Sequence, residues 1–367
     1  MATIFEQNGI RRVINASGRM TALGVSAIDS RTGEAMVQGA QNYVVIDELI
    51  RRAGEIISQY TGGEDSCVTS SASAAIAISV AGLITRGRLD LVERMPDSDG
   101  LKNQVVLQKG HSVNFGAPID QMIRLGGGVP VEAGQANQVK KEHIIGAINE
   151  NTVALMYVKS HHCVQKGMVS LQDMLDIAHQ HQLPLLLDAA AEEDLRGYVA
   201  MGADLVCYSG AKAIEGPTSG FVTGKKDLIA YAQAQYKGIG RAMKVGKDCI
   251  MGLLKALELY DQKDMAAYEA GQEKTVDQLL EGLSGLPGIR CSKSVDEAGR
   301  KIVRARVDVL PGSGTTAQAV ADRLKEGSPA VYTRDHYLNV GSIYFDPRPM
   351  LEGDVQAVVE KMRSILA

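Results

Sequence analysis

The stretch Asp204–Lys225 reads DLVCYSGAKAIEGPTSGFVTGK, and the fold can be worked out from it. An apolar run ends at Ser209-Gly210-Ala211-Lys212, and after the turn Gly216-Pro217 a second apolar run covers Gly220-Phe221-Val222. This pattern predicts a strand, a loop and a second strand, with Lys212 held on the loop between two turns. A lysine on a short rigid loop can be aimed, and partial burial of a lysine favours its nucleophilic neutral amine. For Lys212 taken alone, a solvated loop lysine is the alternative.

A second candidate residue lies upstream, where Leu185-Leu186-Leu187 runs directly into Asp188. Three apolar residues before an aspartate predict a buried parallel strand with the carboxylate at its carboxyl end, where open α/β sheets bind their ligands. A carboxylate at that place can keep the pyridine nitrogen of pyridoxal phosphate (PLP) protonated, and Lys212 can form a Schiff base with the cofactor's aldehyde. A helix N-cap is the alternative for Asp188.

A run of small hydroxyl residues supplies a candidate phosphate site. The short apolar segment Cys67-Val68-Thr69 leads into Ser70-Ser71-Ala72-Ser73, and a helical pattern follows over 76–84. Backbone N–H groups at a helix start, together with serine hydroxyls, can form a cup for a phosphate. An ordinary helix N-cap is the alternative.

Composition narrows the class of protein. The chain has 367 residues and a net charge of −4 with no basic block, so we expect a large domain with a smaller one and no nucleic-acid partner. The start of the sequence has no signal-peptide pattern, and no apolar run reaches the ~18 residues of a membrane span. Five cysteines without C-x-x-C spacing predict reduced thiols in a cytoplasmic protein, with no metal site.

The order of the predicted elements gives the domain organisation. Strands and helices alternate as far as Lys225, which predicts an α/β fold with a mostly parallel, doubly wound sheet. The rhythm changes after Gly285, and within the later part we expect a helix over 251–265 and a strand over 337–343. The predicted domains are an N-terminal arm at 1–40, a large domain at 41–250 and a small α+β C-terminal domain at 251–367.

Taken together, the chain resembles the fold-type I PLP enzymes, and among them the selenocysteine-synthase-like family. The resemblance spans nearly the whole chain in the family's order and is carried by these segments: Ile14-Asn15-Ala16-Ser17-Gly18, Lys109-Gly110-His111, Leu187-Asp188, Tyr208-Ser209-Gly210-Ala211-Lys212 and Gly216-Pro217. It implies an aspartate-aminotransferase-like large domain, PLP as cofactor and a homodimer or higher homo-oligomer.

The resemblance also implies roles for individual residues. Lys212 would form the Schiff base and remove the Cα proton, Asp188 would pair with the pyridine nitrogen, and His111 would lie near the face of the ring. The cofactor phosphate would be held by hydroxyls from Ser70, Ser71, Ser73 and Ser209. A neighbouring subunit would complete that site with Thr218 or Ser219.

The expected reaction is an α,β-elimination that converts a β-hydroxy amino acid or a phosphorylated amino sugar acid into a 2-oxo acid and ammonia. Such a reaction needs a general acid for the departing hydroxyl, and the candidates are Lys212, His111, His161 and His162. An anionic substrate needs cationic partners. Arg241 and Lys244 lie in the segment where the resembling family keeps two basic residues for an anionic group, and we assign them to the sugar phosphate. Arg334 lies in the small domain, where fold-type I enzymes often hold the substrate carboxylate, and Arg19 is a further anion-binding candidate. A surface charge is the alternative for each of these four residues.

Two other functions stay open. One is selenocysteine synthesis on a charged tRNA, which two departures weaken. The Asn15-Ala16-Ser17-Gly18 motif appears almost at once, without the family's extra N-terminal domain, and Val25 stands where the family has an arginine. The other is an inactive binding protein on the same fold, which is disfavoured because Asp188, Ser209 and Lys212 are all present.

Overall fold

A computed structural model describes residues 3–160, 162–296 and 301–367. The chain divides into two compact units, and each is described by itself. The larger unit consists of residues 28–262, and the smaller unit combines residues 1–27 with residues 263–367.

The larger unit is built on a seven-stranded sheet. Its spatial order is β2-β8-β7-β6-β5-β3-β4, and every neighbouring pair is parallel except the two that involve β8. The predicted mostly parallel sheet is therefore confirmed. The strands are β2 (Asp65–Thr69), β3 (Gln104–Gln108), β4 (Val129–Ala133), β5 (Thr152–Val158), β6 (Leu185–Asp188), β7 (Leu205–Ser209) and β8 (Gly220–Gly224).

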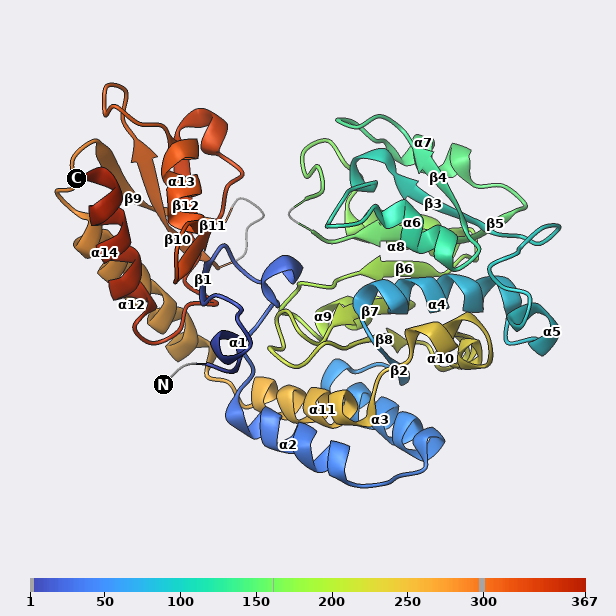
Figure 1. The fold of residues 1–367 in the computed structure, drawn as a ribbon. Helices are drawn as coiled ribbons and strands as arrows, with labels where there is room; N and C mark the ends of the chain where they lie inside the picture. Colours follow the sequence, from blue (N-terminus) through green and yellow to red (C-terminus); the bar gives the residue numbers. More distant parts are fainter. Residues whose placement is uncertain (1–2, 161, 297–300) are drawn as a thin grey trace. The chain divides into compact units, whose positions relative to one another are not determined.

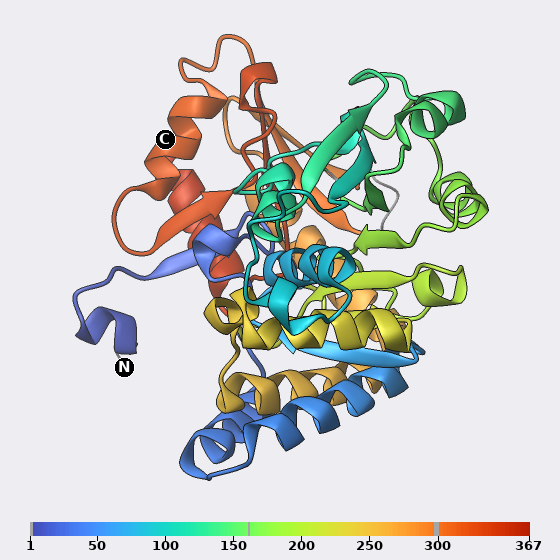
Figure 2. The same cartoon turned by 90° about the vertical axis from the view of Figure 1, so that its right-hand side faces the viewer.

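Helices cover both faces of this sheet (Figures 1 and 2). Leu185 and Leu187 pack into one buried hydrophobic cluster and Leu186 into the other, which is why β6 is apolar along its whole length. One face carries α3 (Ile46–Thr61), α7 (Lys141–Ala147), α8 (Leu171–Gln180) and α11 (Lys247–Asp261). The other carries α4 (Ala72–Thr85), α6 (Ile119–Leu125) and α10 (Lys226–Ala234). Outside these layers lie α2 (Ser30–Gln41), which packs on α11, and the short helices α5 (Leu89–Val92) and α9 (Gly197–Ala200).

The smaller unit has an α+β architecture, as expected for the C-terminal part. Strand β1 (Val13–Ala16) pairs in parallel with β11 (Ala330–Thr333), and a three-stranded antiparallel sheet has the order β12-β10-β9. The remaining elements are β9 (Ile289–Val295), β10 (Val303–Val309), β12 (Ser342–Phe345), α1 (Ile4–Gln7), α12 (Met265–Leu283), α13 (Ala317–Lys325) and α14 (Asp354–Leu366). Their apolar side chains form one core of their own.

The boundaries of the two units differ from the predicted domain boundaries. Residues 1–27 belong to the smaller unit because β1 pairs with β11, and α2 belongs to the larger unit because it packs along α11. Two element predictions also differ. Helix α11 ends at Asp261 and α12 begins at Met265, where Asp264 caps the new helix by accepting a hydrogen bond from the Ala267 N–H. The predicted strand over 337–343 is a 3₁₀ turn followed by Gly341 in the left-handed region, and β12 begins only after it.

No helix in the described part of the chain is long and apolar enough to cross a membrane.

One close backbone contact joins the start of β8 to the start of α4. A Cβ placed on Gly220 would lie 2.3 Å from the carbonyl carbon of Ser71 and 2.5 Å from the Ala72 nitrogen. Only glycine allows this approach, so the sequence at Gly220 holds the helix start against the sheet.

Replacing Gly220 with alanine should therefore push the α4 start away from β8. We expect Gly220→Ala to destabilise the protein by roughly 2–4 kcal/mol, because neither backbone segment can yield without shifting its element. The matched control is Gly146→Ala on α7, where a Cβ meets no atom within 4 Å. Urea unfolding should show a lower midpoint for Gly220→Ala and an unchanged or higher midpoint for Gly146→Ala. Equal midpoints for the two variants would contradict the steric argument.

Candidate active site

Lys212 lies on a loop that is closed by its own backbone. The Gly210 N–H donates to the Ser219 carbonyl (2.9 Å), the Gly216 N–H donates to the Gly210 carbonyl (2.8 Å), and the Glu215 N–H donates to the Lys212 carbonyl (3.2 Å). These bonds fix residues 210–219 between β7 and β8, as the sequence predicted. The side chain of Lys212 is partly buried on this loop.

Asp188 is the last residue of β6, and its neighbours on both sides are parallel strands. The side chain is buried, one carboxylate oxygen accepts a hydrogen bond from the Ala190 N–H (3.0 Å), and the second accepts none from the described residues. Burial raises the pKa of Asp188 above its usual value, while the positive charge of Lys212 and the Ala190 N–H act in the opposite direction. The two residues that the sequence singled out are therefore electrostatic neighbours.

The start of α4 presents unused donors next to β8. The Ser71 hydroxyl caps the helix by accepting from the Ala74 N–H (3.1 Å), but the N–H groups of Ser71, Ala72 and Ser73 donate to no acceptor in the described chain. The hydroxyls of Ser70 and Ser73 likewise bond to no described residue. A helix start with free N–H groups and hydroxyls suits an anion.

The remaining predicted phosphate ligands divide into two groups. Ser209 faces Gly220 across the sheet, and Gly220 also faces Thr69 at the end of β2, so the Ser209 hydroxyl lies at the same sheet edge as the cup. Ser219 is buried and donates its hydroxyl to the Pro217 carbonyl (2.8 Å), so it is occupied within its own loop. Thr218, by contrast, is exposed.

Arg241 and Lys244 belong to the segment after α10, which lies beside the Ser70–Ser73 segment. The Ser70 N–H donates to the carbonyl of Met243 (3.2 Å), which joins the end of β2 to this segment. Both cationic side chains are exposed, and neither makes an ion pair with a described residue. The structure thus brings these two predicted anion ligands to the neighbourhood of the serines.

His111 is buried at the end of β3. Its Nδ1 accepts a hydrogen bond from the Val158 N–H (3.2 Å), and its ring packs edge-on against Tyr157, with 4.5 Å between the centroids. Burial, and then the charge of Lys159, lowers the pKa of His111 to about 4. At neutral pH the ring is therefore uncharged, which favours a packing role for His111 over that of an acid drawn from an imidazolium.

The other two histidine candidates follow β5. His161 lies outside the described residues. The loop begins beside Asp188, since the Lys159 N–H donates to the Asp188 carbonyl (2.8 Å), and His162 is partly buried with its N–H bonded to the Ser160 hydroxyl (3.2 Å).

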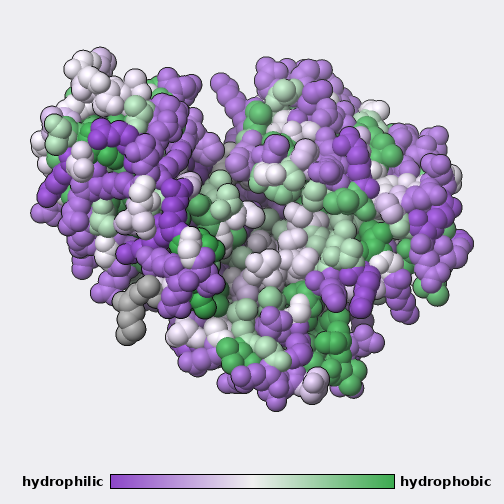
Figure 3. All heavy atoms as spheres, in the orientation of Figure 1, coloured by the Kyte–Doolittle hydropathy of each residue, from purple (hydrophilic) through white to green (hydrophobic). Residues whose placement is uncertain are grey.

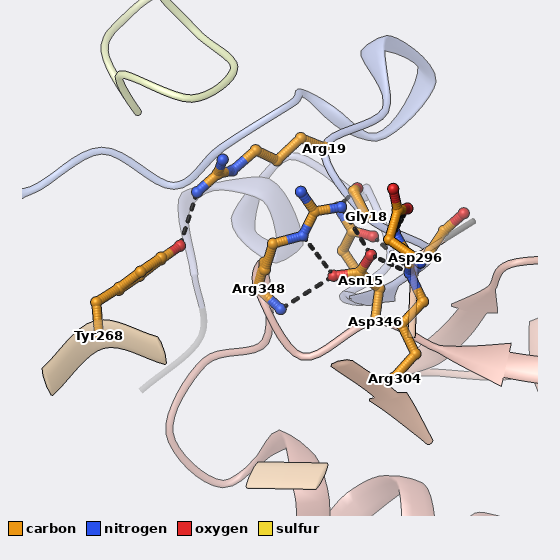
Figure 4. Close-up of polar contacts among 9 residues, drawn as sticks. Asn15, Gly18, Arg19, Tyr268, Asp296, Arg304, Asp346 and Arg348 are labelled. Carbon is orange, nitrogen blue, oxygen red and sulfur yellow. Dashed lines mark hydrogen bonds and ion pairs between the residues drawn. The ribbon is translucent and has the colours of Figure 1, made fainter. Parts of the chain in front are cut away.

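Two predicted substrate ligands belong to the smaller unit. Arg19 donates to the hydroxyl of Tyr268 (2.7 Å), and Figure 4 shows its guanidinium extending toward that ring. Arg334 is partly buried, and its guanidinium makes no hydrogen bond or ion pair with the described residues. Burial, and then the charge of Arg304, lowers the pKa of Arg334 to about 10.

Sequence reasoning missed a group of buried charges around Arg334. Asp346 and Arg348 lie after β12, and Arg304 lies on β10. The available signal was the same one that identified Asp188, because the apolar run Ile343-Tyr344-Phe345 also ends in an aspartate.

Because the pKa of His111 is about 4 in the folded chain and near 6.5 when unfolded, the unfolded state binds more protons between these values. The stability from the neutral ring is present above about pH 6.5 and is lost as the pH falls toward about 4, by roughly 3 kcal/mol. We expect the urea midpoint of the wild type to fall more over this window than that of His111→Phe, which keeps an aromatic ring but cannot titrate. If the urea midpoints of the wild type and His111→Phe fell by the same amount over this pH window, the buried, neutral state of His111 would be contradicted.

Comparison with known proteins was made for the sequence and for the fold. The family model described as SelA, L-seryl-tRNA selenium transferase, matches residues 13–281. The chain is 48% identical over 363 residues to D-glucosaminate-6-phosphate ammonia lyase of Salmonella typhimurium strain 14028s, covering 99% of this chain and 97% of that protein. It is 37% identical over 365 residues to 5'-C-glycyluridine monooxygenase-decarboxylase of a Streptomyces species, covering 99% and 92%.

The solved structures agree with these matches. The structure of a D-glucosaminate-6-phosphate ammonia-lyase has a TM-score of 0.93 and 47% identity, covering 100% of this chain and 98% of that one. Aspartate aminotransferase from Thermus thermophilus has a TM-score of 0.56 at 19% identity, covering 98% and 93%, which shows the shared fold. The chain has the aspartate-aminotransferase-like PLP fold-type I architecture and belongs to the L-seryl-tRNA selenium transferase family.

Proposed function

We propose that this protein is a PLP-dependent ammonia lyase that converts D-glucosaminate 6-phosphate into 2-keto-3-deoxygluconate 6-phosphate and ammonia. The observation that carries the proposal is the buried Asp188 carboxylate at the end of β6, which feels the positive charge of Lys212 on its closed loop. The 48% identity to a D-glucosaminate-6-phosphate ammonia lyase along nearly the whole chain supports the choice of reaction and substrate.

The residues present fit PLP at three points. Asp188 is buried, and one of its carboxylate oxygens has no partner in the described chain, which suits a protonated pyridine nitrogen. Free N–H groups and serine hydroxyls at the start of α4 suit the phosphate, and Lys212 supplies the amine for the aldehyde. When bound, PLP supplies an aldehyde that captures amines and a ring that accepts electrons from the substrate's Cα.

The protein's own groups then carry the proton transfers. Lys212 anchors the cofactor and, once the substrate amine has displaced it, takes the proton from Cα. The β-hydroxyl leaves as water with a proton from a general acid. Protonated Lys212, His161 and His162 remain the candidates, because burial keeps His111 neutral. Water re-enters as the enamine hydrolyses, so the net products are the 2-oxo acid and ammonia.

The two anionic ends of the substrate need separate cations. We assign the phosphate to Arg241 and Lys244, which are exposed beside the serine cup and have no ion-pair partner in the described chain. We assign the carboxylate to Arg334, whose partly buried guanidinium has no partner among the described residues. A planar guanidinium can hold a carboxylate through two parallel hydrogen bonds.

An assay of the purified holoenzyme tests the reaction. With D-glucosaminate 6-phosphate we expect ammonia and 2-oxo acid in equal amounts, without oxygen uptake or carbon dioxide release. Lys212→Ala should keep the circular dichroism spectrum and lose turnover by several orders of magnitude. Near-wild-type turnover in that variant would remove Lys212 from the mechanism. Oxygen uptake would instead favour chemistry of the kind named for the Streptomyces relative.

The phosphate assignment predicts a selective effect on substrate binding. Arg241→Ala and Lys244→Ala should each raise KM for the phosphorylated substrate by ~10-fold or more, and raise it far less for unphosphorylated D-glucosaminate. The PLP content of each variant is the control, because Lys244 is one residue from the Met243 carbonyl that bonds to Ser70. Equal rises in KM for both substrates, or a loss of PLP, would contradict the assignment.

We also propose a homo-oligomer of at least two subunits. Apolar side chains are exposed where α2 connects to α3, and Figure 3 shows hydrophobic surface in that region. The exposed residues are Val37, Tyr43, Val44, Val45 and Ile46. Contiguous exposed apolar surface is typical of protein–protein contacts, and exposed Thr218 remains the candidate that reaches a neighbour's cofactor phosphate. A fully active monomer in sedimentation experiments would refute this proposal.

We place the protein in the cytoplasm. All five cysteines are free thiols, three of them buried, which suits a reducing compartment. Recovery of the protein in a periplasmic fraction would contradict this location.

A further inference from the structure

Two buried thiols flank the carboxylate of Asp188 in the larger unit. Within the sheet, Asp188 on β6 lies opposite Val158 on β5 and opposite Cys207 on β7. Residues paired side by side point to the same face of a sheet, so the Cys207 thiol is a direct neighbour of the carboxylate. Burial, and then the negative charge of Asp188, raises the pKa of both Cys163 and Cys207. Two protonated thiols therefore lie close to this carboxylate.

Both thiols give their protons to other groups. Cys163 Sγ donates to the Val158 carbonyl (3.4 Å). Cys207 has Ser79 on α4 as its hydrogen-bonding neighbour. The Ser79 hydroxyl donates its own proton to the Ala75 carbonyl (2.7 Å), which can only accept. The Ser79 oxygen therefore keeps only acceptor capacity toward Cys207, and the thiol proton of Cys207 goes to it.

As a result, the Asp188 carboxylate accepts no hydrogen bond from a side chain of the described residues. Its donor in that part of the chain is the Ala190 N–H (3.0 Å). A neutral donor that bonds to a carboxylate stabilises the negative charge and lowers its affinity for a proton. A carboxylate that lacks such a donor is a stronger acceptor for a cationic N–H group.

We propose that Cys207 is a positioning residue that acts through Asp188. With its proton held by Ser79, Cys207 withholds a neutral donor from Asp188, so that the carboxylate binds the protonated ring nitrogen of PLP strongly. The proposal rests on the cofactor role of Asp188 given under Proposed function. It adds the pair of Cys207 and Ser79, which sets the strength of that contact.

Two substitutions reverse the arrangement by different routes. Cys207→Ser supplies the donor that the thiol withholds, because a hydroxyl is a better donor than a thiol and an ionised carboxylate is a better acceptor than the Ser79 oxygen. Ser79→Ala removes the acceptor of the Cys207 S–H, which can then turn to Asp188. In both variants the carboxylate gains a neutral donor and loses affinity for a ring N–H.

The test compares PLP with its deaza analogue, in which a C–H group replaces the ring nitrogen. The purified holoenzyme is equilibrated with a mixture of the two, and the ratio of bound PLP to bound analogue gives their relative affinity without turnover. The wild type should prefer PLP, since the analogue leaves the Asp188 carboxylate buried without a cationic partner. We expect Cys207→Ser to lower this preference by ~10-fold or more, because the new hydroxyl weakens the contact with PLP and satisfies the carboxylate beside the analogue.

The matched control is Cys67→Ser, the same substitution in the same layer of the core. Cys67 lies opposite Val222, which in turn lies opposite Cys207, and all three residues are fully buried. The Cys67 thiol donates to the Val68 carbonyl (3.6 Å), and Asp188 is not among the charges that act on it. Cys67→Ser should leave the preference unchanged, as should any general loosening of the site, which weakens both cofactors alike.

Ser79→Ala supplies an independent arm should Cys207→Ser fail to fold, which circular dichroism reports. It should lower the preference for PLP by ~3-fold, since a thiol is a weak donor, and should have no effect in a Cys207→Ala background, where no thiol proton remains. An unchanged preference in folded Cys207→Ser or Ser79→Ala overturns the role of Cys207, and so does an equal effect of Ser79→Ala with and without the thiol. A preference for PLP that is missing in the wild type, or that survives Asp188→Ala, would instead overturn the pairing of Asp188 with the ring nitrogen.

Discussion

The buried carboxylate of Asp188 is the constraint on which the larger unit depends. An ionised carboxylate loses its hydration when it is buried, and it keeps its charge only beside a cation or strong donors. The structure offers one backbone N–H and the nearby charge of Lys212, and the second carboxylate oxygen accepts no hydrogen bond from the described residues. Under the proposed function, that oxygen would accept from the protonated pyridine nitrogen of PLP. In the proposed function, the closed loop of Lys212, the free N–H groups of α4 and the glycine contact at the start of β8 contribute to one ligand site with this strand end.

The smaller unit also has a buried aspartate at the end of an apolar run, but its charge is satisfied by other groups. Asp346 directly follows the apolar strand β12 and is also desolvated, but it forms ion pairs with Arg304 and Arg348. Asp188 accepts one hydrogen bond from the described residues, whereas Asp346 forms ion pairs with two guanidiniums. The two aspartates thus differ in how the structure satisfies their buried charge.

Local patterns in the sequence were enough to predict most strands and helices of the larger unit. Apolar runs with glycine turns identified β5, β6, β7 and β8, because strands buried on both faces must be apolar throughout. The division of the chain into its two units could not be predicted from local patterns. The pairing of β1 with β11 joins residues more than 300 positions apart, and no local periodicity encodes it. The break between α11 and α12 depends on a single cap at Asp264, within a run whose composition remains helical.

The candidate site could likewise be predicted from the sequence only in part. The sequence identified candidate residues at the ends of strands, but it did not show which groups the serine and threonine hydroxyls bond to. Ser219 was an equal candidate with Thr218 until the structure showed its bond to the Pro217 carbonyl. His111 could be placed near the ring by family resemblance, but its lowered pKa follows from burial against Tyr157 and β5, which is a tertiary property. The ion pairs of Asp346 likewise depend on strand register.

The central claim is that the protein removes a Cα proton and a β-hydroxyl and then releases an enamine that hydrolyses to a 2-oxo acid. Turnover of D-glucosaminate 6-phosphate in deuterium oxide, followed by NMR of the product, tests this claim most directly. The account predicts one solvent deuterium at C3 of the 2-oxo acid in the first turnovers, because C3 acquires its new proton from solvent after the hydroxyl has left. A 2-oxo acid that retains the C3 hydroxyl, or a product with no deuterium at C3, would contradict it.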